Sequence, residues 1–131
     1  MSELDFDNKQ QDQRPSSIAR RRLIEATKNS IAGLASCFKY EEAFRIQVCI
    51  AIIALPSIYW VADNVMEGLL LFFVIALLLI TELLNSALEA TVDRIGLDYH
   101  ELSERAKDIA SAAVFCAIVL AAVTWLTLII T

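Results

Sequence analysis

Three long apolar runs without a charged residue occupy most of the chain after Arg45. They contain 17, 14 and 23 residues. A membrane-spanning helix needs about 20 residues, within a range of about 17–25, so the middle run is long enough only if its helix continues past Glu82 to Leu88. We therefore expect an all-helical membrane protein with three spans, over residues 46–62, 68–88 and 109–131.

The residues before these runs have a different pattern. Residues 1–16 are polar without a period, and we expect a disordered tail there. From about residue 18 to 40, apolar side chains recur at roughly helical spacing among basic ones, with Ser16 or Ser17 as a candidate N-cap. This pattern favours an amphipathic helix on the membrane surface, and a helix that packs on its neighbours in water is the alternative. Residues 17–131 would form a single domain.

Composition and charge exclude several classes of protein. Of the 131 residues, 57% are hydrophobic and the net charge is −5, so a nucleic-acid partner is not expected. The three cysteines are scattered, without the spacing of a zinc site or a disulfide framework. All eleven lysines and arginines lie within residues 9–45 and 94–107. The positive-inside rule then predicts a cytoplasmic N-terminus and cytoplasmic loop 89–108, with the C-terminus outward.

The stretch from Thr81 to Asp93 carries the most informative polar side chains. At 100° per residue, five of them lie within an arc of about 100°; these are Glu82, Asn85, Ser86, Glu89 and Asp93. Ordinary solvated charges on a helix that emerges into water are the alternative, above all for Asp93. Glu82, however, lies about 21 Å from the outer end of its span, inside a hydrocarbon core about 30 Å thick. An ionisable residue at that depth is costly and a functional candidate.

Further polar side chains lie at the same membrane face. Glu41 and Glu42 precede the first span, and Lys107, Asp108 and Ser111 lie at the start of the third. Carboxylates can hold Mg²⁺, a lysine can neutralise phosphoryl charge, and a glutamate can take a proton from a hydroxyl. The set suggests phosphoryl transfer to a lipid alcohol, without a glycine-rich phosphate loop. A proton relay or a non-catalytic membrane subunit that uses Glu82 remains open, and Lys107 could be a simple interfacial anchor.

Three segments make the sequence similar to a known family. EEAFRIQ (41–47), TELLNSALEATVDRIG (81–96) and YHELSERAKDIASAAV (99–114) resemble the prokaryotic diacylglycerol kinase family. The resemblance implies a homotrimer in the bacterial inner membrane, with a surface helix and three spans in each subunit. It also implies active sites shared between subunits at the cytoplasmic interface, where the γ-phosphoryl group of Mg-ATP passes to diacylglycerol. Undecaprenol is the alternative acceptor, because relatives of this family phosphorylate it.

The same resemblance assigns roles to individual residues. Glu82 matches the catalytic base, Glu41 and Glu89 match Mg²⁺ ligands, and Asp93 matches a further polar group. Matches to the nucleotide site are Arg22, Asn29, Glu41, Asn85, Glu89, Asp98, Tyr99, His100, Lys107 and Asp108. Matches to the lipid-substrate site are Arg22, Ser30, Ala43, Phe44, Arg45, Gln47, Glu82 and Ser111. The chain departs from the family pattern at Asn29, where an aromatic is usual, at Ile31, where a tryptophan is usual, and at Gln47, which replaces a carboxylate.

Overall fold

The computed structural model describes residues 15–130, and every regular element in that part is a helix, which confirms the all-helical prediction. The helices are α2 (Pro15–Tyr40), α3 (Glu42–Val61), α4 (Val65–Ile95) and α5 (Glu101–Ile130). By its internal contacts the chain divides into a unit that ends at Ser36 and a unit that begins at Cys37. The C-terminal unit contains all of α3, α4 and α5.

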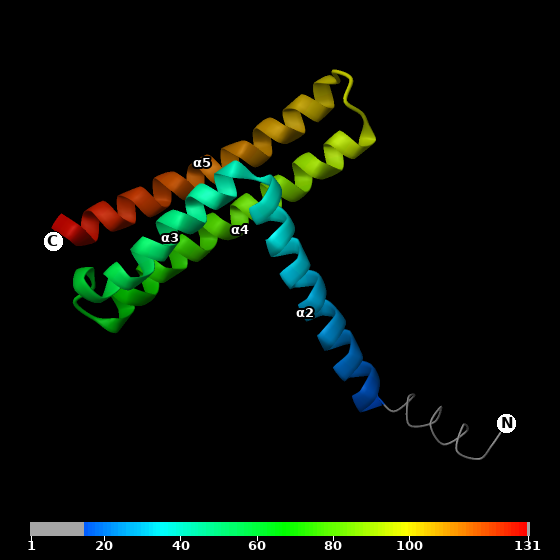
Figure 1. Ribbon diagram of the computed structural model, residues 1–131. Coiled ribbons are helices and arrows are strands. Elements are labelled where there is room, and N and C mark those ends of the chain that lie inside the picture. The colour runs from blue at the N-terminus through cyan, green and yellow to red at the C-terminus, as the bar shows by residue number, and fades with distance from the viewer. Residues whose placement is uncertain (1–14, 131) are drawn as a thin grey trace, which may run out of the picture. The chain divides into compact units, whose positions relative to one another are not determined.

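The three helices of the C-terminal unit lie side by side, and α4 packs against both α3 and α5 (Figure 1). All three are long and apolar enough to cross a membrane, so the chain is a multi-pass membrane protein. Many large apolar side chains on their outer faces are exposed, as expected for helices surrounded by lipid or by other apolar chains.

The charged segment 89–108, expected as the cytoplasmic loop between the second and third spans, is mostly helical. Helix α4 continues to Ile95 and α5 begins at Glu101, which leaves a connection of residues 96–100. Glutamate, arginine and lysine are good helix formers; a charge therefore marks where a helix leaves the bilayer and not where it ends. At 31 residues, α4 is about 46 Å long and exceeds the hydrocarbon core by about 16 Å.

The N-terminal unit consists of most of α2. This helix starts at Pro15, three residues before the expected start at Ile18, and proline is well tolerated in the first turn because no N–H is needed there. The tail predicted to be disordered lies mainly outside the described residues. Along α2, apolar side chains such as Leu23 and Ile31 are exposed.

The turn between α3 and α4 is held by a reciprocal cap. Asn64 accepts a hydrogen bond from the backbone N–H of Glu67 (3.1 Å), and its side-chain amide donates to Glu67 Oε1 (2.8 Å). The N–H of Asp63 donates to the second oxygen of the same carboxylate (2.8 Å). These bonds satisfy N–H groups that α4 leaves unpaired at its start and allow two spans to be joined by a very short turn.

A single buried stripe runs along α4 and changes its chemistry halfway. Its first members are Leu71, Val74 and Ile75, and its later members are Glu82, Asn85, Ser86 and Val92. The spacing of three or four residues places them on one face of the helix, which α3 and α5 cover. The polar arc predicted from the sequence therefore begins inside the helix bundle, as a continuation of its apolar core.

Candidate active site

Glu82 lies in the buried part of this stripe and is bonded to a neighbouring helix. The Gln47 side chain on α3 donates from Nε2 to Glu82 Oε2, at 2.6 Å. Both side chains are nearly inaccessible, with 9% of Gln47 and 4% of Glu82 exposed. A buried carboxylate requires such a donor, because an unpaired one loses its hydration without compensation.

One turn further along α4, Asn85 repeats this arrangement. Its Nδ2 donates to Glu89 Oε1 at 2.9 Å. Within the described residues, the buried side-chain oxygens without a hydrogen-bond partner are Gln47 Oε1 and Asn85 Oδ1. Each of the two side-chain amides thus donates to a carboxylate through its nitrogen, while its own oxygen accepts no hydrogen bond. Buried acceptors of this kind are rare in folded proteins and are expected to serve a purpose.

The end of α2 that belongs to the C-terminal unit is tied to the same face of α4. Buried Cys37 donates from Sγ to Ser86 Oγ, at 3.5 Å. Ser86 neighbours Asn85 and lies one turn from Glu82, so the sequence-predicted polar face contacts this segment as well as α3. Among the predicted nucleotide and lipid residues, neither Cys37 nor Ser86 was included.

Arg45 closes the corner between α2 and α3. Its Nη1 donates to the carbonyl oxygens of Phe38 (3.2 Å) and Lys39 (3.1 Å), in the last turn of α2. A cation at this position satisfies unpaired carbonyls and complements the negative end of the helix dipole. Glu41 is the residue at the corner, as the N-cap of α3, so the guanidinium holds the backbone from which Glu41 projects.

The register of α3 against α4 brings Glu41 to the level of Glu89. Gln47 lies opposite Glu82, and α3 and α4 run in opposite directions because a very short turn connects them. Glu41 lies six residues before Gln47 and Glu89 seven after Glu82, which corresponds to about 9 and 10 Å along the two axes. Within the described residues, no three His, Cys, Asp or Glu side chains form a ready metal cluster, so these two glutamates would be joined by ligands from elsewhere.

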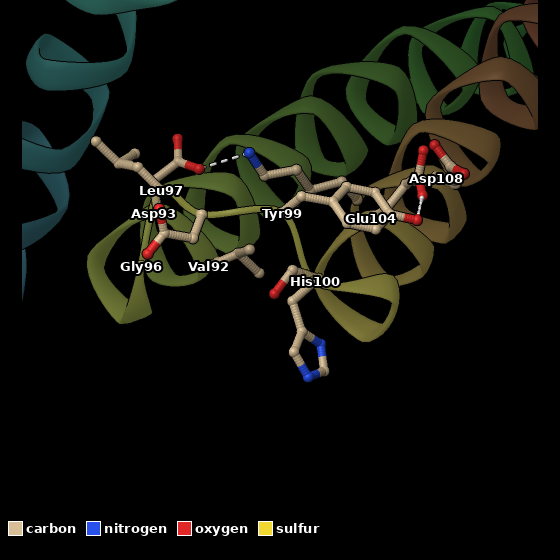
Figure 2. Close-up of a pocket in the computed structure, with 11 residues that line it drawn as sticks. Val92, Asp93, Gly96, Leu97, Tyr99, His100, Glu104 and Asp108 are labelled. Carbon is tan, nitrogen blue, oxygen red and sulfur yellow. Dashed lines mark hydrogen bonds and ion pairs between the residues drawn. The ribbon is translucent and has the colours of Figure 1, made fainter.

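A pocket of about 490 Å³ lies beyond the buried stripe, around the connection between α4 and α5 (Figure 2). Of the side chains predicted to bind nucleotide or to belong to the site, it brings together Asp93, Asp98, Tyr99, His100, Lys107 and Asp108. The two helices supply opposite walls, and the connection 96–100 supplies the rim.

An ion pair crosses this pocket from α5 to α4. Lys107 Nζ donates to Asp93 Oδ1 at 2.5 Å, with 38% of the lysine side chain and 49% of the aspartate side chain exposed. Lys107 precedes the charge-free run that begins at Ile109 and so lies outside the predicted third span, 109–131. Its pKa is raised above the usual value, chiefly by the hydrogen bond to Asp93; desolvation opposes this with a smaller effect, and the negative charges of Asp93 and Glu89 raise the pKa further. The lysine is therefore positively charged at any physiological pH.

The sequence reasoning missed Glu104 on the wall of this pocket. Tyr99 Oη donates to Glu104 Oε2 at 2.9 Å (Figure 2). Helical spacing was the available signal, because Glu104, Lys107 and Asp108 lie on one face of α5. His100 accepts a bond at Nδ1 from the N–H of Leu102 (3.2 Å), which places its ring at the start of α5.

The remaining predicted residues lie in three places. Phe44 is buried at the start of α3, and Ser111 is exposed on α5 one turn beyond Lys107. Arg22, Asn29 and Ser30 belong to the N-terminal unit, where their side chains are exposed. Their part in a site with the C-terminal unit stays a prediction.

A second hollow on the C-terminal unit is almost entirely apolar. It measures about 590 Å³ and is lined by α3, α4 and α5. Ala43, Ile46 and Gln47 are lining residues near the start of α3, and Trp125 lines it on α5. Gln47 thus borders both this apolar groove and the carboxylate of Glu82.

Comparison with known proteins identifies a family. The sequence model of the family "Prokaryotic diacylglycerol kinase" matches residues 28–129. Diacylglycerol kinase of Haemophilus influenzae is 45% identical over 103 residues, covering 79% of this chain and 87% of that protein. The diacylglycerol kinase of Pseudomonas aeruginosa is 43% identical over 110 residues, covering 84% and 89% of the two chains. That of Escherichia coli K12 is 44% identical over 104 residues, covering 79% and 85%.

Proposed function

This chain belongs to the prokaryotic diacylglycerol kinase family, and on that premise we propose that it transfers the γ-phosphoryl group of ATP to diacylglycerol. The product would be phosphatidic acid. Beyond the family match, the observation that carries the proposal is Glu82, a carboxylate buried where the α4 stripe turns from apolar to polar. A lipid alcohol presents its hydroxyl at this boundary, with its acyl chains in the apolar region.

Glu82 acts as the general base. It takes the proton of the lipid hydroxyl while the hydroxyl oxygen forms a bond to the γ-phosphorus. The bond from the γ-phosphorus to the bridging oxygen breaks, and its electron pair leaves with ADP. The hydrogen bond from Gln47 supports this role because it stabilises the carboxylate in the absence of water.

Mg²⁺ would be held by Glu41 and Glu89 together with the phosphate oxygens of ATP. The donor set fits, because Mg²⁺ in phosphoryl-transfer sites usually has one or two carboxylate ligands with phosphates and water completing the shell. The ion would neutralise negative charge on the transferring phosphate. Asn85 orients Glu89 by its bond to Oε1, which leaves Oε2 available as a ligand.

The pocket at the connection 96–100 binds the nucleotide in this proposal. Lys107 is held in the pocket by Asp93, and a phosphate group of ATP would replace Asp93 as its partner. The positive charge then lies beside the phosphates and offsets charge that develops during transfer. Asp98, Tyr99 and His100 form the rim that covers the nucleotide.

The lipid lies on the opposite side of Glu82. The groove bordered by Ala43 and Gln47 has the apolar lining that an acyl chain requires. Arg22, Ser30, Phe44 and Ser111 are the further lipid contacts that we propose from the family pattern. Arg45 contributes through the corner that it closes.

In the cell, we place the chain in the bacterial inner membrane with the N-terminus and the connection 96–100 in the cytoplasm. The lysines and arginines lie on that side, as the positive-inside rule requires. A homotrimer with sites shared between subunits completes the proposal.

Transfer of label from ATP tests the function directly. Purified protein in mixed micelles receives Mg²⁺, labelled ATP and either diacylglycerol or undecaprenol, and the lipids are separated by thin-layer chromatography. Label in phosphatidic acid is expected. Label mainly in undecaprenyl phosphate would keep the mechanism and replace the substrate, whereas no labelled lipid from folded protein would reject the kinase assignment.

Mixed oligomers test the shared site. Glu82→Gln chains, which lack the base, and Lys107→Leu chains, which should bind ATP weakly, are co-reconstituted at varied ratios with different affinity tags and assayed at an ATP concentration at which each alone has little activity. Recovered activity in doubly tagged oligomers is expected, because some sites there combine an intact Glu82 with an intact Lys107. Verified mixed oligomers without activity would contradict the sharing of these two residues.

A further inference from the structure

The proposed base is in contact with one neutral amide, and that amide has an unused atom. Gln47 donates from Nε2 to Glu82 Oε2, while its own Oε1 is buried without a partner. A side chain that only filled space here would be better apolar, because a buried carbonyl without a hydrogen-bond partner destabilises the fold. The amide is therefore retained at a cost to the fold, next to the group that the reaction needs.

The two ends of the amide suit the two protonation states of Glu82. The N–H end donates to a carboxylate, which is the state that accepts a proton. The carbonyl end can accept from a carboxylic acid, which is the state that follows transfer, and half a turn of the terminal amide exchanges the two ends. No other described contact of Glu82 offers both a donor and an acceptor on one group.

We infer that Gln47 is a positioning residue for Glu82: its amide holds Oε2, leaves Oε1 free to take the proton of the lipid hydroxyl, and accommodates the protonated base afterwards. This inference rests on the proposed function. In the step, the hydroxyl O–H bond breaks, its proton forms a bond to Glu82 Oε1, and the hydroxyl oxygen bonds to the γ-phosphorus as ADP leaves. Gln47 itself gains and loses no proton.

Few ionisable groups other than Gln47's neighbour Glu82 itself lie in this part of the bundle, so few could influence the protonation of Glu82 in place of Gln47. The faces of α3 and α5 at this depth carry apolar side chains apart from Gln47. The ionisable groups that are hydrogen-bonded to the same face of α4 are Cys37, through Ser86, and Glu89, through Asn85. Neither is bonded to Glu82, so the state of the base depends chiefly on the amide.

The first test replaces Gln47 with methionine, which is unbranched and of similar length but neither donates nor accepts in this way. We expect Gln47→Met to lower kcat by about 10- to 100-fold, as misplacement of a reacting group does, with KM for ATP nearly unchanged. KM for diacylglycerol, whose proposed groove Gln47 borders, should change by a smaller factor than kcat. Ile52→Met, at an exposed position of the same helix, is the matched control. A kcat equal to that of the unaltered enzyme would overturn the inference.

The second test replaces Gln47 with glutamate, which keeps size and shape and changes only the chemistry. Two carboxylates at hydrogen-bonding distance cannot both ionise, so they share a proton. We expect Gln47→Glu to fold normally and to need a higher pH for half-maximal kcat. An unchanged pH profile would mean that residue 47 does not contact the reacting carboxylate, and that result would also overturn the inference.

The two experiments distinguish this inference from the function on which it rests. Failure of the unaltered enzyme to label any lipid rejects the function. Normal labelling together with normal Gln47→Met kinetics rejects only the positioning role. If Gln47→Met does not assemble, as judged by gel filtration in detergent, the pH profile of Gln47→Glu still decides the matter.

Discussion

The polar face of α4 has two stretches, around Glu82 and around Asp93, that share the same helical spacing but differ in burial and in bonding partners. Around Glu82, the polar side chains of α4 are buried and bonded to α3 and to the end of α2. Around Asp93, about three turns later, the corresponding side chains are half exposed and pair across to α5. The comparison shows that burial, and not the presence of charge, determines what each polar group can do.

In the proposed mechanism, the chemical step takes place at the buried stretch and the nucleotide binds at the exposed one. A carboxylate shielded from water keeps its interactions strong and its geometry fixed. An exposed pair such as Asp93–Lys107 is screened and contributes little to folding, but it can open to admit an anionic ligand. The proposed base and the proposed nucleotide pocket are therefore located where their surroundings suit their tasks.

The largest expected effect comes from neutralising the buried carboxylate. Glu82→Gln keeps the shape and a hydrogen bond to Gln47 but removes the base, so kcat should fall by about 10²- to 10⁴-fold. ATP binding, measured by equilibrium dialysis, should persist. Glu101→Gln, at an exposed position on α5, should leave kcat unchanged, and retained activity in Glu82→Gln would remove Glu82 as the base.

A substitution in the exposed stretch should weaken ATP binding more than it lowers kcat. Lys107→Met removes a cation from the pocket, and KM for ATP should rise by about 10- to 100-fold, the value of a charged hydrogen bond. Because the lysine remains protonated at physiological pH, its titration should contribute nothing to the pH dependence of this KM between 6 and 8, so the ratio of the Lys107→Met KM to the KM of the unaltered enzyme should stay constant over that range. Arg105→Met on the same helix is the control. An equal rise in its KM for ATP would mean that the overall positive charge of this region, and not Lys107 in particular, attracts ATP.

The free energy of unfolding should depend on the buried carboxylate, Glu82, far more than on the exposed one, Asp93. Glu82→Ala leaves the buried Gln47 amide without its partner and should cost about 1–3 kcal/mol of unfolding free energy. Asp93→Ala should change the melting temperature very little, because its carboxylate and its partner are both hydrated. Thermal melting in detergent, followed by circular dichroism, measures both. Equal losses would mean that the two stretches are not different environments.

The smallest effect is expected at the rim of the pocket. Tyr99→Phe removes the bond to Glu104 between two exposed side chains, and the stability should change by about 0.5 kcal/mol or less. Any change in KM for ATP should be smaller than that of Lys107→Met. A larger KM effect would show that the Tyr99 hydroxyl contacts the nucleotide itself.

The amino-acid sequence by itself determined the helical class, the three spans and the helix face that carries Glu82, Asn85 and Glu89. Charge-free runs of this length have few alternatives to a spanning helix, and a period of 3.6 residues assigns side chains to a face without knowledge of neighbours. Helix ends were harder to predict. Charges at residues 89–108 suggested a loop, but such residues extend helices into water as readily as they end them.

Only the tertiary structure decided which polar groups meet. The Gln47–Glu82 bond joins residues 35 positions apart, and the Asp93–Lys107 pair depends on how α5 aligns with α4. A shift of one residue along either helix would turn these side chains away by 100°, and no local pattern encodes that register. The short turns that set it, the Asn64–Glu67 cap and the connection at Gly96, act through three-dimensional geometry. Glu104 is different, because helical spacing within α5 already places it on the face of Lys107 and Asp108.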